Sequence, residues 1–104
     1  MSKVALLAKL TAAEGKRDEL VEALKAAITA VEAEEKTEVY ALHVDAGDES
    51  TVWFYELYTD QDGFTAHSTG DAMKALGGVG PLMGGRPELI FLTPVAAKGL
   101  SFSA

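Results

Sequence analysis

The chain contains no cysteine, which excludes disulfide bonds, thiolate metal sites and thiol nucleophiles. No apolar run approaches the length of a membrane-spanning helix. The first residues, Met1 to Val4, show neither the charged region nor the apolar stretch and cleavage site of a secretory signal peptide. We therefore expect a soluble, cytoplasmic protein.

Basic residues are also scarce. Nine Lys and Arg stand against sixteen Asp and Glu, which gives a formal net charge of −7. Proteins that bind nucleic acids or anionic membranes need basic patches, so we expect neither partner. The acidic residues gather in residues 18–38 and 45–62, where they favour solubility.

Apolar residues, by contrast, make up 48% of the 104 positions, which is enough for a packed core. This length predicts a single domain over residues 1–104, with a core at about 3–95 and a C-terminal tail at 96–104. A chain of this size buries only about 60 to 70% of its unfolded surface. A second copy of the chain would therefore add useful burial.

Hydrophobic periodicity predicts four strands and two helices. The strands cover residues 3–10, 37–45, 50–59 and 87–95. The clearest helix covers residues 16–33, where apolar residues recur every three or four positions on one face. Those residues are Leu20, Leu24, Ile28 and Val31. A second helix starts at Asp60 as N-cap, weakens at residues 68–70 and resumes to residue 76.

The resulting order, β-α-β-β-α-β, predicts a ferredoxin-like α+β fold. In this fold, two helices pack on one face of a four-stranded antiparallel sheet. The third strand then places Val52, Phe54, Glu56 and Tyr58 on one face and Trp53, Tyr55 and Leu57 on the other. The first and fourth strands are apolar on both faces.

The second face of this sheet needs a cover that the helices cannot provide. Burying one large apolar side chain contributes about 1.5–3 kcal/mol, so a patch of several such side chains favours an interface. We expect a homodimer with its sheets face to face, closing a dimeric α+β barrel. A monomer whose open face binds another molecule is the alternative.

His67 is the leading candidate for a catalytic group. An imidazole can take a proton from a phenol near neutral pH, and the resulting phenolate can react with oxygen by electron transfer. Phe64 and Tyr58 would lie beside it, with the Tyr58 hydroxyl holding a substrate oxygen. A purely structural histidine is the alternative. His43 fits a sheet-face position better, and two histidines without a nearby carboxylate predict no metal site.

Glu56 is a carboxylate in the middle of an apolar strand. Burial of an unpaired charge is costly, so we expect either a partner or a raised pKa. Arg86, a lysine or a histidine could pair with it, and a role as catalytic base is the second possibility. Phe54 and Tyr40 are further candidates for lining a substrate pocket.

The segment of residues 77–86 holds five glycines and Pro81. It lacks the Lys-Ser/Thr ending of a phosphate-binding loop and follows no strand, so it is not a nucleotide site. It could be a mobile lid, with Leu82 and Met83 closing the pocket and Arg86 at its rim. A plain flexible connection is equally compatible with the sequence.

From about Val4 to Val95 the chain resembles the antibiotic biosynthesis monooxygenase family of the dimeric α+β barrel group. The resemblance depends on the apolar first strand, on Glu14-Gly15, on Glu38-Val39-Tyr40-Ala41-Leu42, and above all on Phe54-Tyr55-Glu56-Leu57-Tyr58-Thr59-Asp60 followed by Ala66-His67. It implies a small dimeric enzyme with a pocket between sheet and helices. Members oxidise polyketide-like phenols or quinols without metal or flavin, degrade haem, or act on a small phosphorylated signalling sugar.

The sequence departs from these relatives because it contains no asparagine. Haem-degrading relatives use an asparagine on the first strand, so haem oxygenation is not expected. Quinone-forming relatives use an asparagine and a tryptophan on the third strand and a tyrosine in the next helix. Our placement puts Phe54, Tyr58 and Phe64 at those positions.

The resemblance thus implies a cofactor-independent monooxygenase that oxidises a small aromatic, phenolic or quinol-like compound with molecular oxygen as co-substrate. The residues expected to act are His67 and Glu56 as catalytic groups and Tyr58, Phe64, Phe54, Tyr40 and Arg86 as substrate-binding groups. A non-catalytic small-molecule binding module, or an isomerase or lyase using the same pocket, are the alternatives.

Overall fold

Every predicted strand and helix is present in the computed structural model of the chain, which describes residues 2–101. The elements follow in the order β1 (Val4–Thr11), α1 (Arg17–Val31), β2 (Thr37–Val44), β3 (Thr51–Tyr58), α2 (Gln61–Ser68), α3 (Asp71–Ala75), the 3₁₀ turn η1 (Gly80–Leu82) and β4 (Glu88–Leu92). The helix expected after Asp60 is split into α2 and α3 at the predicted weak point. The last three residues of the predicted tail lie outside the described residues.

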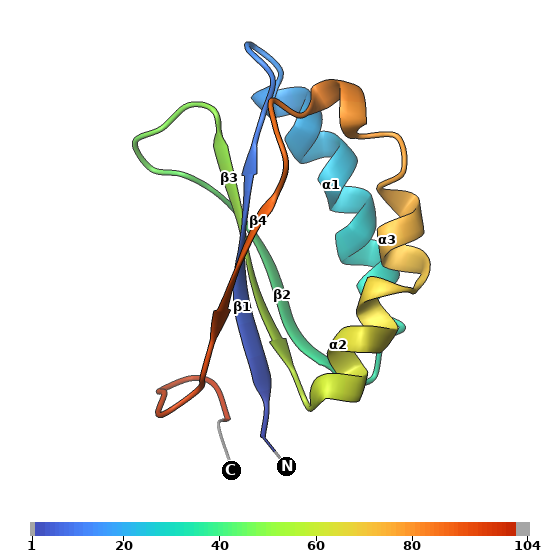
Figure 1. The fold of residues 1–104 in the computed structure, drawn as a ribbon, viewed down its shortest axis with the longest axis vertical. Coiled ribbons are helices and arrows are strands. Elements are labelled where there is room, and N and C mark those ends of the chain that lie inside the picture. Colours follow the sequence, from blue (N-terminus) through green and yellow to red (C-terminus); the bar gives the residue numbers. More distant parts are fainter. Residues whose placement is uncertain (1, 102–104) are drawn as a thin grey trace.

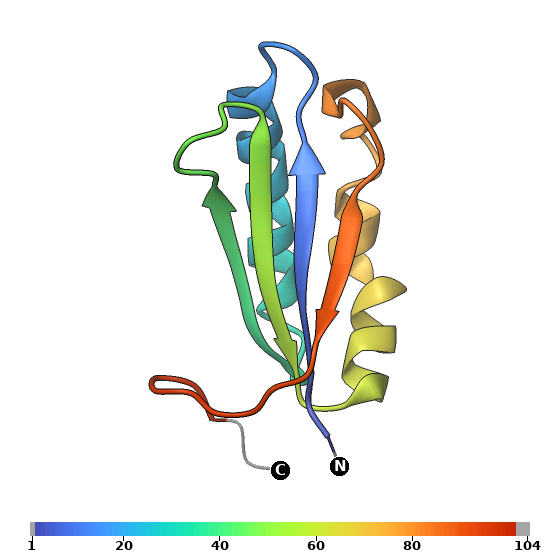
Figure 2. The ribbon, with the colours of Figure 1, turned by 60° about the vertical axis from the view of Figure 1, so that its left-hand side comes forward.

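The strands form one antiparallel sheet in the order β2-β3-β1-β4 (Figure 2). β2 and β3 form the predicted hairpin, and Asp45 closes its turn by accepting hydrogen bonds from the backbone N–H groups of Gly47 and Asp48. The helices all lie on one side of the sheet (Figure 1). This is the predicted ferredoxin-like α+β fold.

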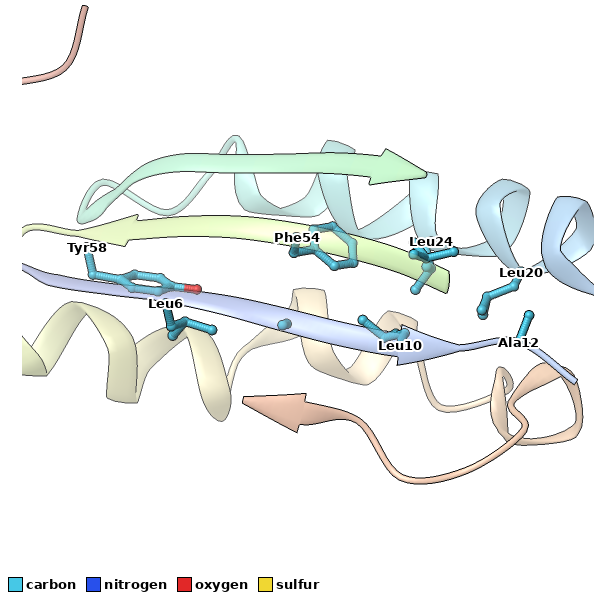
Figure 3. Close-up of a cluster of buried hydrophobic side chains, with 9 residues drawn as sticks. Leu6, Leu10, Ala12, Leu20, Leu24, Phe54 and Tyr58 are labelled. Carbon is cyan, nitrogen blue, oxygen red and sulfur yellow. The ribbon is translucent and has the colours of Figure 1, made fainter. Parts of the chain in front are cut away.

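The core lies between α1 and the sheet (Figure 3). Of the predicted apolar face of α1, Leu20, Leu24 and Val31 are buried, together with Ala27, and Ile28 is partly buried against the same core. It packs on the even-numbered residues of β1 and β3, such as Leu6, Leu10 and Phe54. The alternation of β3 is the predicted one and sends Glu56 and Tyr58 toward the helices.

The start of α2 sets the position of His67, which lies about one and a half helical turns after the first residue of the helix, Gln61. Asp60 Oδ1 accepts a hydrogen bond from the Gly63 N–H at 2.9 Å, as expected for an N-cap. The helix ends at Ser68. A Cβ on Gly70 would lie 2.8 Å from the Ala66 carbonyl oxygen, so glycine lets the chain turn closely into α3.

β4 is shorter than predicted. It covers only Glu88–Leu92 rather than residues 87–95, and all five residues are exposed although four of them are apolar. The exposure follows from the place of β4 in the sheet, because it is an edge strand that pairs only with β1. Pro94 follows two residues later and cannot donate a ladder hydrogen bond.

The glycine-rich segment is tied to the end of β1. The Gly84 N–H donates to the Thr11 carbonyl at 2.7 Å, and the Ala13 N–H donates to the Leu82 carbonyl at 2.8 Å. A Cβ on Gly84 would lie 2.8 Å from the Ala12 carbonyl oxygen. Glycine is therefore required at position 84 for the segment to approach β1 this closely.

The face of the sheet away from the helices is largely open (Figure 2). The chain after β4 crosses it only at one end, where the paired residues Ala5 and Leu57 are buried. Within residues 2–101, no helix combines the length and apolar character that spanning a bilayer demands.

Candidate functional site

A cavity of about 660 Å³ lies between the sheet and the helices. Its walls are mostly apolar and come from β1, β3, α1 and the segment after α3; they include Leu6, Leu10, Leu24, Phe54, Leu76 and Met83. Four side chains with titratable groups also line it: Tyr40, Glu56, His67 and Arg86. A mostly apolar cavity with a few convergent polar groups is the usual form of a small-molecule site.

His67 connects two carboxylates from distant parts of the chain. It is 3% exposed and lies on α2. Its Nδ1 lies 2.9 Å from Glu34 Oε1, and its Nε2 lies 3.9 Å from Glu56 Oε1. The ring is therefore held on one side, while the other nitrogen is directed toward a cavity-lining residue.

Glu56 is 5% exposed in the middle of β3. Its Oε1 accepts a hydrogen bond from the Tyr58 hydroxyl at 2.5 Å. Burial raises the pKa of the Glu56 carboxyl above its ordinary value, although the Tyr58 hydrogen bond and the nearby His67 act in the opposite direction. Of the partners expected for Glu56, the structure places a histidine, His67, beside it, together with Tyr58, rather than Arg86 or a lysine.

Aromatic rings surround the imidazole of His67. The ring centroid of Tyr40 lies 4.9 Å from that of His67 and 4.5 Å from that of Phe54, on which it stacks. The Tyr58 ring lies 5.4 Å from His67 and meets Phe64 edge-on at 5.5 Å. Burial is the main cause that raises the pKa of both tyrosine hydroxyls, so they stay protonated.

Six of the seven predicted site residues line this one cavity: His67, Glu56, Phe64, Phe54, Tyr40 and Arg86. Tyr58 does not, because it is fully buried and its hydroxyl is bonded to Glu56. Its hydroxyl can thus influence a ligand only through Glu56. Arg86 is exposed, as expected at a rim. Met83 lines the cavity, but Leu82, which the lid interpretation also placed there, does not.

Outside this cavity, the described residues form no comparable group of polar side chains around a hollow. His43 is exposed on the open face of the sheet, opposite the face that borders the cavity. A second hollow of about 500 Å³ lies beside Gly15 and Glu49 and is lined by loop residues and by Arg17 and Asp18 at the start of α1. Within residues 2–101, no three His, Asp or Glu side chains gather in a way that could hold a metal ion.

Glu34 is the site residue that the sequence did not reveal. It lies in an acidic stretch after α1, which reads as an ordinary solvent-exposed turn. Only the fold brings it to His67, across 33 positions of sequence. Glu34 also accepts a hydrogen bond from the Thr37 hydroxyl at 2.6 Å.

The arrangement is suited to proton transfer. His67 lines the cavity and its Nε2 lies 3.9 Å from Glu56 Oε1, so this nitrogen is the one that could accept a proton from a hydroxyl bound there. The neighbouring Glu56, with its raised pKa, can hold or return a proton.

Several solved structures share this architecture. A Nitrosomonas europaea protein of unknown function, NE2512, is 27% identical over 97% of both chains, with a TM-score of 0.83. A Caulobacter crescentus protein named as a candidate antibiotic biosynthesis monooxygenase is 26% identical, covers 91% of this chain and 92% of its own, and has a TM-score of 0.84. Rv0793 of Mycobacterium tuberculosis is 25% identical, covers 92% of this chain and 98% of its own, and has a TM-score of 0.82.

None of the curated proteins compared with this chain matches it. The family model described as antibiotic biosynthesis monooxygenase matches residues 3–77, well over half of the chain. That segment contains β1 to α3 and with them Glu34, Glu56 and His67. The chain belongs to the antibiotic biosynthesis monooxygenase family.

Proposed function

We propose that this protein is a cofactor-independent monooxygenase that oxidises a small phenolic or quinol-like compound with molecular oxygen. The observation that carries the proposal is the position of His67 and Glu56 on an otherwise apolar cavity of about 660 Å³. That volume lies within the range of sites for drug-sized ligands. Family membership supports oxygen chemistry as the reaction class.

In the proposed reaction, His67 Nε2 takes the proton of a ring hydroxyl and creates an electron-rich phenolate. The phenolate passes one electron to oxygen, and the two radicals combine at the ring C–H carbon para to the hydroxyl. The peroxide that forms takes a proton from the imidazolium. Loss of the C–H proton and cleavage of the O–O bond then leave a quinone carbonyl and one molecule of water.

Each part of the cavity has a role in this scheme. Tyr40, Phe54 and Phe64 offer ring faces against which a flat substrate could stack. Glu56 could hold the proton that leaves the ring carbon, since burial raises its pKa. Arg86 at the rim could bind a polar substituent of the substrate.

Oxygen uptake with a panel of naphthols and quinols tests the proposal. We expect uptake matched by quinone formation in the natural protein and its loss in His67→Ala. His43→Ala is the matched control, because His43 lies on the opposite face of the sheet, and it should keep full activity. Tight binding of a compound without turnover would show that the protein is a binding module and not an enzyme. Turnover in the absence of oxygen would indicate an isomerase or a lyase.

The binding-module alternative has one specific observation in its favour. At the third-strand positions where we place the asparagine and tryptophan of quinone-forming relatives, this chain has Phe54 and Tyr58. Tyr58 does not line the cavity. A ligand here would thus meet fewer polar groups than in those relatives.

We also propose that two copies pair through the open faces of their sheets. Ile90 and Leu92 on this side are 45% and 40% exposed, and Leu7, Trp53 and Tyr55 are only half-buried. Apolar patches that extend across several strands usually mark an interface. A two-fold dimer would cover this patch with an identical one.

A further inference from the structure

Glu34 holds His67 from outside the cavity. It lies in the turn between α1 and β2 and does not line the cavity, and its side chain is 18% exposed. Its Oε1 accepts from the Thr37 hydroxyl at 2.6 Å and lies 2.9 Å from His67 Nδ1. Glu34 therefore touches the imidazole on the side away from any bound ligand.

This contact decides which ring nitrogen carries the proton of a neutral His67. A carboxylate can only accept hydrogen bonds, so a 2.9 Å contact requires a proton on Nδ1. The opposite tautomer would direct Nε2–H at Glu56 Oε1 across 3.9 Å, which is too long for a hydrogen bond. It would also bring the Nδ1 lone pair against a carboxylate oxygen.

We propose that Glu34 is a positioning residue that fixes His67 as the Nδ1–H tautomer and leaves the Nε2 lone pair free as the base. This inference rests on the proposed function for its catalytic consequence, but not for the tautomer itself. Thr37 supports the arrangement by holding the same Glu34 oxygen. The carboxylate also balances the positive charge that the ring gains when Nε2 takes a proton.

The tautomer can be measured without any substrate. Nitrogen-15 chemical shifts of a histidine ring distinguish a protonated from an unprotonated nitrogen. The chain has two histidines, so spectra of a His43→Gln variant contain the His67 ring alone. At a pH where the ring is neutral, we expect Nδ1 protonated and Nε2 unprotonated.

Two substitutions then separate the roles of Glu34. Glu34→Ala should abolish the preference for Nδ1–H, whereas Glu34→Gln should keep it, because the amide oxygen still accepts a hydrogen bond. Glu35→Ala is the matched control, since it removes the same charge from the adjacent, exposed position. It should leave the His67 spectrum unchanged.

Turnover provides the second measurement. We expect kcat to fall roughly 10- to 100-fold in Glu34→Ala, as for other residues that orient a functional histidine. KM should change by less than about twofold, because Glu34 does not touch the ligand. Glu34→Gln should show a smaller loss, because it keeps the orientation but not the charge.

The result that would overturn the inference is a wild-type His67 with its proton on Nε2, or an unchanged tautomer in Glu34→Ala. If Glu34→Ala does not fold, the wild-type and Glu34→Gln spectra decide. A protein with the expected tautomer but no oxygen uptake would refute the proposed function and leave the tautomer assignment intact. The two failures are therefore distinguishable.

Discussion

Replacing Leu24 with alanine tests whether the cavity and the core share one wall. Leu24 is fully buried at the centre of α1 (Figure 3). The substitution removes three carbons, and each buried carbon contributes about 0.8 kcal/mol, or about 2.4 kcal/mol together. Lost packing around the new space adds to this. Because Leu24 already borders the 660 Å³ cavity, the added loss is small, and we expect about 2.5–3.5 kcal/mol in total.

Leu20→Ala is the matched comparison. Leu20 is also fully buried on α1, but it does not line the cavity. Its removal opens a closed space beside Leu10 and Ala12, so the packing loss applies in full. We expect about 3–5 kcal/mol, which is more than for Leu24→Ala.

Urea unfolding measures both values. The free energy of unfolding should fall with little change in the denaturant dependence, m. All variants must be compared at one protein concentration, because self-association would stabilise each of them. A loss below about 1 kcal/mol for Leu24→Ala, or a larger loss than for Leu20→Ala, would refute the shared wall.

Three further predictions concern Glu56, the sheet face and the glycine-rich segment. Because burial raises the pKa of Glu56, the folded protein keeps that proton to higher pH than the unfolded chain, and this group makes stability decline as pH rises above about 4.5. Glu56→Gln should therefore gain stability over wild type as pH rises from about 5 to about 8, measured by thermal unfolding, and parallel curves for the two proteins would contradict the raised pKa. Trp53→Asp should yield a monomer or an unfolded chain in sedimentation, and an unchanged dimer would count against the proposed interface. Gly84→Ala should cost about 1–3 kcal/mol by crowding the Ala12 carbonyl, whereas Gly85→Ala, with open space around its Cβ, should be nearly neutral; equal effects would argue against the close approach.

The sequence predicts the β3 side of the site well, because alternation along a strand is local. Once β3 is a strand, Phe54 and Glu56 must share a face, and the helix after Asp60 must carry His67 near them. The apolar stripe of α1 then decides which face of the sheet is covered. The positions of these residues could therefore be predicted from local sequence patterns alone.

The rest of the site depends on contacts that no local pattern encodes. Glu34 looks like its neighbours Glu32 and Glu35, and only the packing of α1 and α2 against β2 brings it to His67. Tyr58 shares a face with Glu56, but pairing between the two side chains takes its hydroxyl out of the cavity. The exposure of β4 follows from its edge position in a single chain.

The most direct test of the central claim is a crystal structure of the protein with a naphthol bound. We expect the ligand to fill the cavity, with its hydroxyl oxygen about 2.6–3.2 Å from His67 Nε2 and its rings against Tyr40 or Phe54. A ligand on the open face of the sheet, or one in the cavity with its hydroxyl turned toward Arg86 and away from His67, would contradict it.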